Sequence, residues 1–185
     1  MKNPKLSNRY AKALYEFSLE NDNLEAVYQD VVYIKTIFRD NRDLFVVIES
    51  PVIFPEKKIK IFADVFEKKT SQITFGFLKL LIMKKREPAL LQICEEFIKF
   101  YYKHHNIKIA QITTAQELDE ALLLKIKEIL EEQSHATVEI HLKIDPKIVG
   151  GFIVKIEDFI IDASILAKIN QLKREFSFNI YQRQY

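Results

Sequence analysis

Residues 145–165, DPKIVGGFIVKIEDFIIDASI, contain two of the three glycines of the whole chain. The pair, Gly150 and Gly151, directly precedes an apolar run whose pattern predicts a β-hairpin. Glycine suits this position because it adopts positive φ angles and lets another backbone come close. After the hairpin, Asp162 and Ser164 can cap a further helix. The stretch therefore predicts an irregular turn, a hairpin and a helix in succession.

Two further strands are expected upstream of the hairpin. Residues 107–115 are rich in β-branched side chains, which favour strands. Residues 137–145 alternate between apolar and polar side chains, which predicts a strand with one buried face. The residues expected on this buried face are Val138, Ile140, Leu142 and Ile144.

Two helices complete this second part of the chain. One is expected over residues 117–133, with an apolar face made of Leu118, Leu122, Ile126 and Ile129. The other is expected over residues 164–176, where it would bury Ile165, Ile169, Leu172 and Phe176. The sequence thus predicts a small α/β domain over residues 106–185, with a tail from about residue 177.

Residues 1–105 read as six successive helices. Apolar side chains recur there with helical spacing, and Pro51, Pro55 and Pro88 mark helix boundaries. In the first helix the expected apolar face is made of Tyr10, Ala13, Leu14 and Phe17. The fold class is therefore mainly α, an N-terminal six-helix bundle followed by the small α/β domain.

Composition excludes several classes of function. The 28 basic and 26 acidic residues give a net charge of +2, which argues against a nucleic-acid-binding protein. The single cysteine cannot form an internal disulfide and fits a reducing compartment. No secretory signal is evident, and no apolar run approaches the roughly 20 residues of a membrane span. The chain is expected to be soluble, or peripheral to a membrane through a partner.

Few residues are candidates for catalysis or metal binding. His104 and His105 are adjacent, so on a helix they point in different directions and cannot share a metal ion as an i, i+4 pair could. Cys94 lies on the apolar stripe of the sixth helix, where core packing is the simpler interpretation. We therefore predict no catalytic, cofactor-binding or metal-binding residue. An enzyme that uses Cys94 or a histidine stays open as an alternative.

The fifth helix, SQITFGFLKLLIMKK at residues 71–85, is apolar nearly all round, which indicates either full burial or a second partner. Within it, Gly76 costs about 1 kcal/mol relative to alanine, and the close approach of another helix would offset that cost. Phe75, Leu78 and Ile82 fit a core face. A second face consists of Ile73, Gly76, Phe77 and Leu80. Ala13 could help to wall a groove beside it, so a central helix and a helix-in-groove site are both open.

Two stretches resemble a known family. NRYAKALYEFSLE, at residues 8–20, resembles the opening helix of the F-type ATP synthase delta subunit, the bacterial counterpart of the mitochondrial oligomycin sensitivity-conferring protein. KIDPKIVGGFIVKIEDFIIDASILAKINQLKREF, at residues 143–176, resembles the C-terminal signature of that family. The resemblance covers nearly the whole chain. Glu157 and Ala163 stand where the family often has glycine.

The resemblance implies a non-catalytic stator subunit without a cofactor. Such a subunit links the catalytic head to the peripheral-stalk b subunits and resists rotor torque during proton-driven ATP synthesis. Its bundle would receive the N-terminal helix of an alpha subunit between the first and fifth helices, and its C-terminal domain would contact the b subunits. The partner-binding residues implied by position are Tyr10, Ala13, Phe17, Ile73, Gly76, Phe77 and Leu80.

The same resemblance implies a location. The chain would be monomeric within its complex, peripheral at the cytoplasmic side of a bacterial inner membrane, and neither inserted in the membrane nor bound to nucleic acid. A helical adaptor for some other amphipathic helix is the main alternative, because the fifth helix supports it equally. Only the stator hypothesis also explains the signature at residues 145–165.

Overall fold

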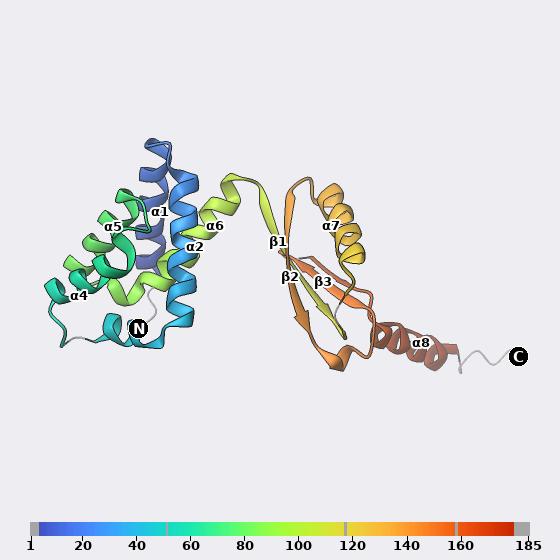
Figure 1. Cartoon of the computed structure of the whole chain (residues 1–185). Helices are drawn as coiled ribbons and strands as arrows, with labels where there is room; N and C mark the ends of the chain where they lie inside the picture. The colour runs from blue at the N-terminus through green and yellow to red at the C-terminus, as the bar shows by residue number, and fades with distance from the viewer. Residues whose placement is uncertain (1–3, 51, 117, 158, 180–185) are drawn as a thin grey trace, which may run out of the picture. The chain divides into compact units, whose positions relative to one another are not determined.

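The computed structural model describes residues 4–50, 52–116, 118–157 and 159–179 (Figure 1). The chain divides into two compact units, Met1–His105 and Asn106–Tyr185. Most described residues are helical, and the strands form a four-stranded sheet in the second unit. This confirms the prediction of a mainly helical chain with a small sheet.

The first unit contains only helices among its described residues. They are α1 (Pro4–Glu20), α2 (Leu24–Asp40), α3 (Arg42–Glu49), α4 (Pro55–Phe62), a π-helical segment (Ala63–Glu67), α5 (Gln72–Met83), a 3-10 helix (Glu87–Ala89) and α6 (Leu90–His104). Proline sets the starts of α4 and of the 3-10 helix, since its fixed φ angle suits a first turn. Ser71 caps α5, because its hydroxyl accepts the Thr74 backbone N–H at 3.3 Å.

The core of the first unit is formed largely by α2 and α5. From α2 it receives Leu24, Val27, Val31, Ile34 and Phe38. From α5 it receives the predicted core face, Phe75, Leu78 and Ile82, together with Leu81. The rings of Phe62 and Phe66 pack on Phe38 with centroid separations of 6.2 and 6.0 Å. These residues hold α4 and the π-helical segment against α2.

The buried face of α1 differs from the prediction. It consists of Ser7, Ala11, Leu14 and Ser18, so only Leu14 of the predicted set is buried. The reason is close packing on α6: small side chains let the two helices approach, while the hydroxyl of Ser18 is satisfied by the Tyr15 carbonyl at 2.8 Å. The helices run in the same direction, since Ser7 bonds to Gln92 and Tyr15 stacks on Phe100.

The second unit is a small α/β fold. Its elements are β1 (Ile107–Thr114), α7 (Glu120–Ser134), β2 (Thr137–Ile144), a 3-10 turn (Pro146–Ile148), β3 (Phe152–Ile156), β4 (Phe159–Asp162) and α8 (Ile165–Asn179). The strand order is β2-β1-β3-β4. β1 pairs in parallel with β2 through the α7 connection, and the other pairs are antiparallel. The unbroken register of β1 excludes a bulge at Ala110.

The glycine pair lies where the start of β3 meets the start of α8. Gly151 has a φ of +78°, and a Cβ atom there would collide with the carbonyl oxygen of Ala163. Gly150 accepts the Ile165 backbone N–H at 2.9 Å. The predicted capping is also present, because the Ser164 hydroxyl accepts the Ala167 backbone N–H at 3.1 Å. Gly151 is therefore required by its φ angle and by the close approach of the backbone, whereas a Cβ atom at Gly150 would meet the side chain of Ile165.

The core of the second unit is smaller than the sequence predicted. It contains Ala110, Ile112, Ile126, Leu130, Val138 and Val154. Helix α7 buries Ile126 and Leu130, whereas the predicted Leu122 and Ile129 are exposed. Leu142 and Ile144, predicted to face inward, are also exposed at the far end of β2. The predicted helix start at residue 117 lies outside the described residues, and so does the turn residue Asp158.

Candidate functional site

The exposed side of α5 carries an uncovered apolar stripe, Ile73, Gly76, Phe77 and Leu80, called the α5 stripe below. Ile73 and Phe77 are half-buried, Gly76 is exposed and Leu80 is 44% exposed. The core face of the same helix lies opposite. A Cβ atom added to Gly76 would meet nothing within 4 Å in the described part of the chain. Packing inside this chain therefore gives no reason for a glycine at this point.

The predicted residues of α1 lie beside its buried face. Tyr10 is half-buried under the guanidinium of Arg9, whose Cζ is 5.6 Å from the ring centroid. Ala13 is exposed, and Phe17 is 52% exposed. Helix α1 packs chiefly on α6, while α5 packs on α2, α4 and the π-helical segment. The two predicted walls of the groove thus have different main packing partners, and both expose apolar groups.

A second uncovered surface was not predicted. The sequence pattern of α8 suggested burial, yet Ile165, Ile169, Leu172 and Phe176 are all exposed, Phe176 by 69%. Strand β4 adds Phe159, Ile160 and Ile161, and Phe159 is 76% exposed. These seven residues are called the C-terminal apolar surface below. One sequence signal could have revealed it: β4 is apolar at consecutive positions, so both of its faces are apolar, whereas an antiparallel hairpin commonly has one solvated face.

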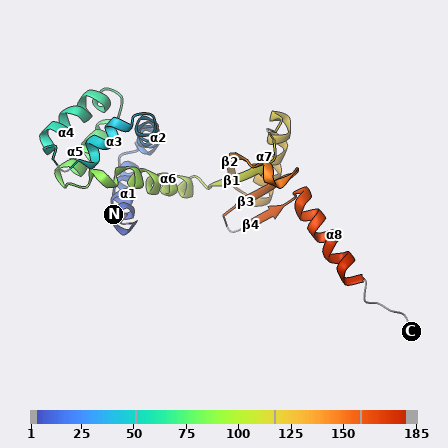
Figure 2. The same ribbon diagram turned by 90° about the horizontal axis from the view of Figure 1, so that it is seen from below.

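Figure 2 shows α8 leaving the edge of the sheet at β4 and continuing away from it. Its polar positions include Lys168, Lys173, Arg174 and Glu175, so the apolar stripe has a largely cationic border. An amphipathic helix without cover exposes apolar area that burial would stabilise by about 25 cal/mol per Å². The helix is therefore suited to contact with another molecule.

The residues considered for catalysis, Cys94, His104 and His105, take part in packing or hydrogen bonding. Cys94 is buried, and burial raises the pKa of its thiol to about 12, so the nucleophilic thiolate is suppressed. The Nδ1 atom of His104 is 2.9 Å from the hydroxyl of Tyr15. The ring of His105 packs on Tyr101 at 4.4 Å. No group of three metal-ligating side chains is found among the described residues.

A buried aromatic cluster supports the end of α6. The rings of Tyr28 and Tyr101 stack at 3.7 Å, and the Tyr101 hydroxyl donates to Glu25 at 2.5 Å. This hydrogen bond lowers the pKa of Glu25. Burial, followed by the Glu25 contact, raises the pKa of Tyr101 to about 12. The cluster thus joins α2 to α6 and has the character of a packing contact.

None of the described helices has an apolar stretch long enough to cross a membrane. The fold and its surfaces define a two-unit protein, in which a helical unit and an α/β unit each expose an apolar face among their described residues. Residues 6–176 match the sequence profile of the family described as ATP synthase delta (OSCP) subunit. The chain belongs to this family, as the resemblance predicted.

Individual relatives agree with this assignment. The ATP synthase subunit delta of Cytophaga hutchinsonii is 36% identical over 177 residues, which make up 96% of this chain and 97% of that protein. The subunit delta of Amoebophilus asiaticus is 33% identical over 181 residues, covering 97% and 98%. A chain of the Toxoplasma gondii mitochondrial ATP synthase hexamer shares the fold with a TM-score of 0.75 at 19% identity, covering 92% of this chain and 97% of that one.

The family defines the broad role of the chain. Its members are non-catalytic, stator-type subunits of F-type ATP synthase, so the chain works in ATP synthesis and the associated ion transport without carrying out the reaction itself.

Proposed function

We propose that the chain is the stator subunit that joins the catalytic head of F-type ATP synthase to the peripheral-stalk b subunits and resists the torque of the rotor. The single observation that carries this proposal is the presence of two uncovered apolar faces on two separate compact units. A connector needs one attachment surface for each neighbour. The complex would be at a bacterial inner membrane, with this chain peripheral at its cytoplasmic side.

The first unit would act as the family's six-helix bundle and bind the N-terminal helix of an alpha subunit between α1 and α5. Gly76 supports this proposal, because its backbone is open to solvent and would let a partner helix approach closely. Leu80 and Phe17 would supply apolar contacts on the two walls. This is the helix-in-groove mode, in which an amphipathic helix buries one face against a hydrophobic groove.

The second unit would bind the b subunits through the C-terminal apolar surface. Its helix α8 presents apolar residues at helical spacing, which suits packing against one face of a long stalk helix. The cationic border of α8 would favour acidic positions on that partner. One copy of the chain would serve both contacts, since the two surfaces belong to different units.

The test is titration calorimetry on the full chain with two synthetic peptides. One peptide is the N-terminal segment of the alpha subunit of the same species, of about 20 residues, and the other is the C-terminal segment of its b subunit. We expect one-to-one binding of each, with the negative heat-capacity change of apolar burial. Saturation with one peptide should leave the affinity for the other unchanged. Competition between the peptides would show that the two surfaces do not serve separate partners.

A further inference from the structure

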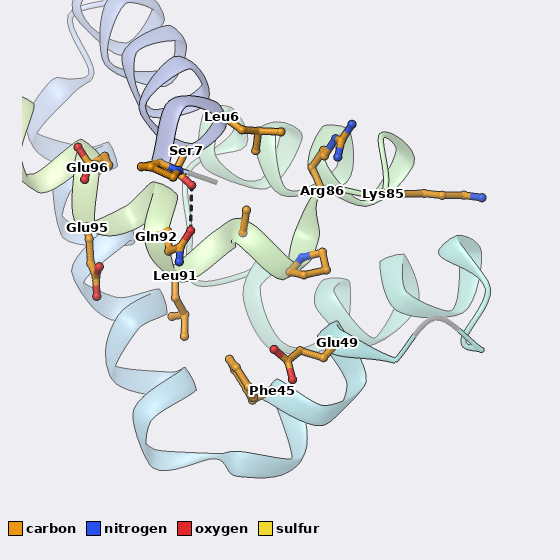
Figure 3. A pocket seen from close by; sticks show the side chains of 13 residues that line it. Leu6, Ser7, Phe45, Glu49, Lys85, Arg86, Leu91, Gln92, Glu95 and Glu96 are labelled. Carbon is orange, nitrogen blue, oxygen red and sulfur yellow. Dashed lines mark hydrogen bonds between the residues drawn. The ribbon is translucent and has the colours of Figure 1, made fainter. Parts of the chain in front are cut away.

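The first unit has a pocket at the beginning of α6 (Figure 3). Its volume is about 830 Å³, which lies within the usual range of binding pockets. Its charged lining residues are of both signs: Glu49, Glu95, Glu96, Lys85 and Arg86. Such a mixed lining does not define the charge of a ligand. The sheet of the second unit is more specific, because the geometry of an edge strand restricts what can pair with it.

The two edge strands of this sheet differ in their protection against pairing. They are β2 and β4, since the strand order is β2-β1-β3-β4. β2 carries Glu139 and Lys143, and charged side chains commonly keep an edge strand from pairing with another chain. β4 consists of three successive apolar residues and Asp162, whose carboxylate accepts the Ser164 backbone N–H at 3.0 Å. The β4 edge is therefore the less protected of the two.

The hydrogen bonds of β4 show which of its backbone groups point out of the sheet. The Ala163 N–H donates to the Phe152 carbonyl at 3.0 Å, in the same register as the rest of the β3–β4 pair. Hydrogen-bonded and non-hydrogen-bonded pairs alternate along an antiparallel ladder. Ile161 therefore bonds to β3, whereas the backbone N–H and C=O of Ile160 and Asp162 point outward. All residues of β4 are exposed.

A second copy of β4 matches these outward groups when it runs antiparallel about a two-fold axis at Ile161. Ile160 of each copy then lies opposite Asp162 of the other, and such a pair can exchange two backbone N–H···O bonds. Ile161 lies opposite its own equivalent, and Phe159 lies opposite the small side chain of Ala163. The contact is isologous, as in most dimers of identical chains.

The charges also suit this register. Asp162 lies opposite Ile160, so the two carboxylates do not face each other. Lys155 is exposed and pairs with Ile160 on β3, which places it on the same face as Asp162 of the other copy, about 10 Å away across two strand spacings. Glu157 lies opposite Ile165 of the other copy, at the beginning of α8, where the helix dipole favours a negative charge.

The contact is small. Each β4 strand has four residues, so the paired strands would bury less area than a standard stable interface does. The strands also end at the hairpin turn of one copy and at the beginning of α8 of the other. The pairing is therefore of the weak, transient class and leaves the apolar stripe of α8 uncovered.

We propose that the chain, when free of its partners, forms a weak symmetric dimer in which two β4 strands pair edge to edge. The pairing continues the sheet from one copy to the other and covers the apolar residues of β4. A molecule that binds the C-terminal apolar surface competes with it. The inference does not depend on the proposed function, because it requires only a second copy of the second unit.

Sedimentation equilibrium of the full chain, from about 10 µM to about 1 mM, covers the range of weak complexes and tests the proposal. We expect a monomer–dimer equilibrium. Ile161→Lys and Ile161→Glu should each raise the dissociation constant at least about tenfold, because like charges then face each other across the axis. An equimolar mixture of these two variants should dimerise at least about tenfold more tightly than either alone. Ile160→Pro, which removes an outward N–H without affecting the bonds to β3, should also weaken the dimer.

The matched controls are Ile144→Lys and Ile144→Glu, which make the same changes at an exposed position of the other edge strand. They should leave the dissociation constant unchanged, and circular dichroism should show all variants folded. A chain that stays monomeric over the whole concentration range overturns the dimer, while the stalk contact is tested separately with the b-subunit peptide. A dimer that Ile160→Pro does not weaken, or that the mixed Ile161 variants do not restore, uses another surface and overturns the β4 pairing.

Discussion

The Nζ atom of Lys58 lies 2.6 Å from Oε1 of Glu87, and both side chains are buried. Lys58 comes from α4 and Glu87 from the 3-10 helix before α6, and the same ammonium group donates to the Ile48 carbonyl at the end of α3 at 2.8 Å. One buried cation thus ties together three segments of the first unit. The second carboxylate oxygen of Glu87 has no hydrogen-bond partner among the described atoms, so the pair is incompletely satisfied.

Removal of one partner of this ion pair should lower the free energy of unfolding substantially. We expect Lys58→Met to lower the free energy of unfolding by about 3–5 kcal/mol, because it leaves a carboxylate buried without its cation. The double variant Lys58→Met, Glu87→Leu should lose much less than either single variant, since no uncompensated charge remains. Urea denaturation of the four proteins provides the measurement. Additive losses in the double variant would show that the pair does not act as a unit.

A second buried carboxylate positions α5. Asp30 of α2 accepts the Ser71 backbone N–H at 2.8 Å and the Thr74 hydroxyl at 2.7 Å, so it caps the helix that carries the α5 stripe. We expect Asp30→Ala to lower the free energy of unfolding by about 2 kcal/mol, because two donors lose their partner. Asp64→Ala, at an exposed position, should change thermal stability little and serves as the control. Equal stability of the two variants would contradict the role given to Asp30.

The structure explains which parts of this first unit were predictable from sequence. The succession of helices in residues 1–105 was predictable because apolar side chains recur there with helical spacing. The buried face of α1 was not predictable, because its contact with α6 uses Ser7, Ala11 and Ser18, which are not strongly hydrophobic. Close helix packing needs small side chains, and their pattern becomes visible only when the partner helix is known.

The error at α8 has a different cause. Amphipathic spacing indicates that one face of a helix will be buried, but it does not say by what. The stripe that ends at Phe176 was assigned to the core of the same chain, whereas in the structure no described residue covers it. The two faces of α5 were separated correctly, since its core face is buried and the α5 stripe is partly or fully exposed. The positive φ angle of Gly151 was predictable because it is a local backbone property, whereas its close approach to Ala163 is visible only in the structure.

Substitutions at Gly76 should affect the stability of the chain and its binding of the alpha-subunit peptide differently. Its surroundings leave room for a Cβ atom, so Gly76→Ala should raise the free energy of unfolding by roughly 0.5–1 kcal/mol through better helix propensity. Gly76→Leu should also remain folded but fill the proposed groove and weaken binding of the alpha-subunit peptide at least about tenfold, or 1.4 kcal/mol. Denaturation and calorimetry on both variants check this pair of outcomes. Unchanged peptide affinity in Gly76→Leu would show that the partner lies on another face.

Cys94 should make the free energy of unfolding depend on pH in the alkaline range. Burial raises the pKa of its thiol from the usual 9.0 to about 12, so between these values the unfolded chain releases a proton that the folded chain keeps. Stability is therefore unaffected below about pH 9 and falls as the pH rises toward 12. Cys94→Ala should reduce this slope in pH-dependent denaturation. Tyr101, whose pKa is also raised, contributes to the pH dependence that remains in the Cys94→Ala variant.

The C-terminal apolar surface should tolerate changes that a core would not. Leu172 is 52% exposed in α8, so Leu172→Glu should leave the melting temperature of the isolated chain nearly unchanged. Leu130→Ala, in the buried core of the same unit, should lower stability by about 2–5 kcal/mol. For binding, Leu172→Glu should have the larger effect of the two variants. It should abolish detectable affinity for the b-subunit peptide, because it places a charge in the contact. A folded Leu172→Glu variant that binds this peptide normally would exclude α8 from the stalk contact and leave β4 as the remaining candidate.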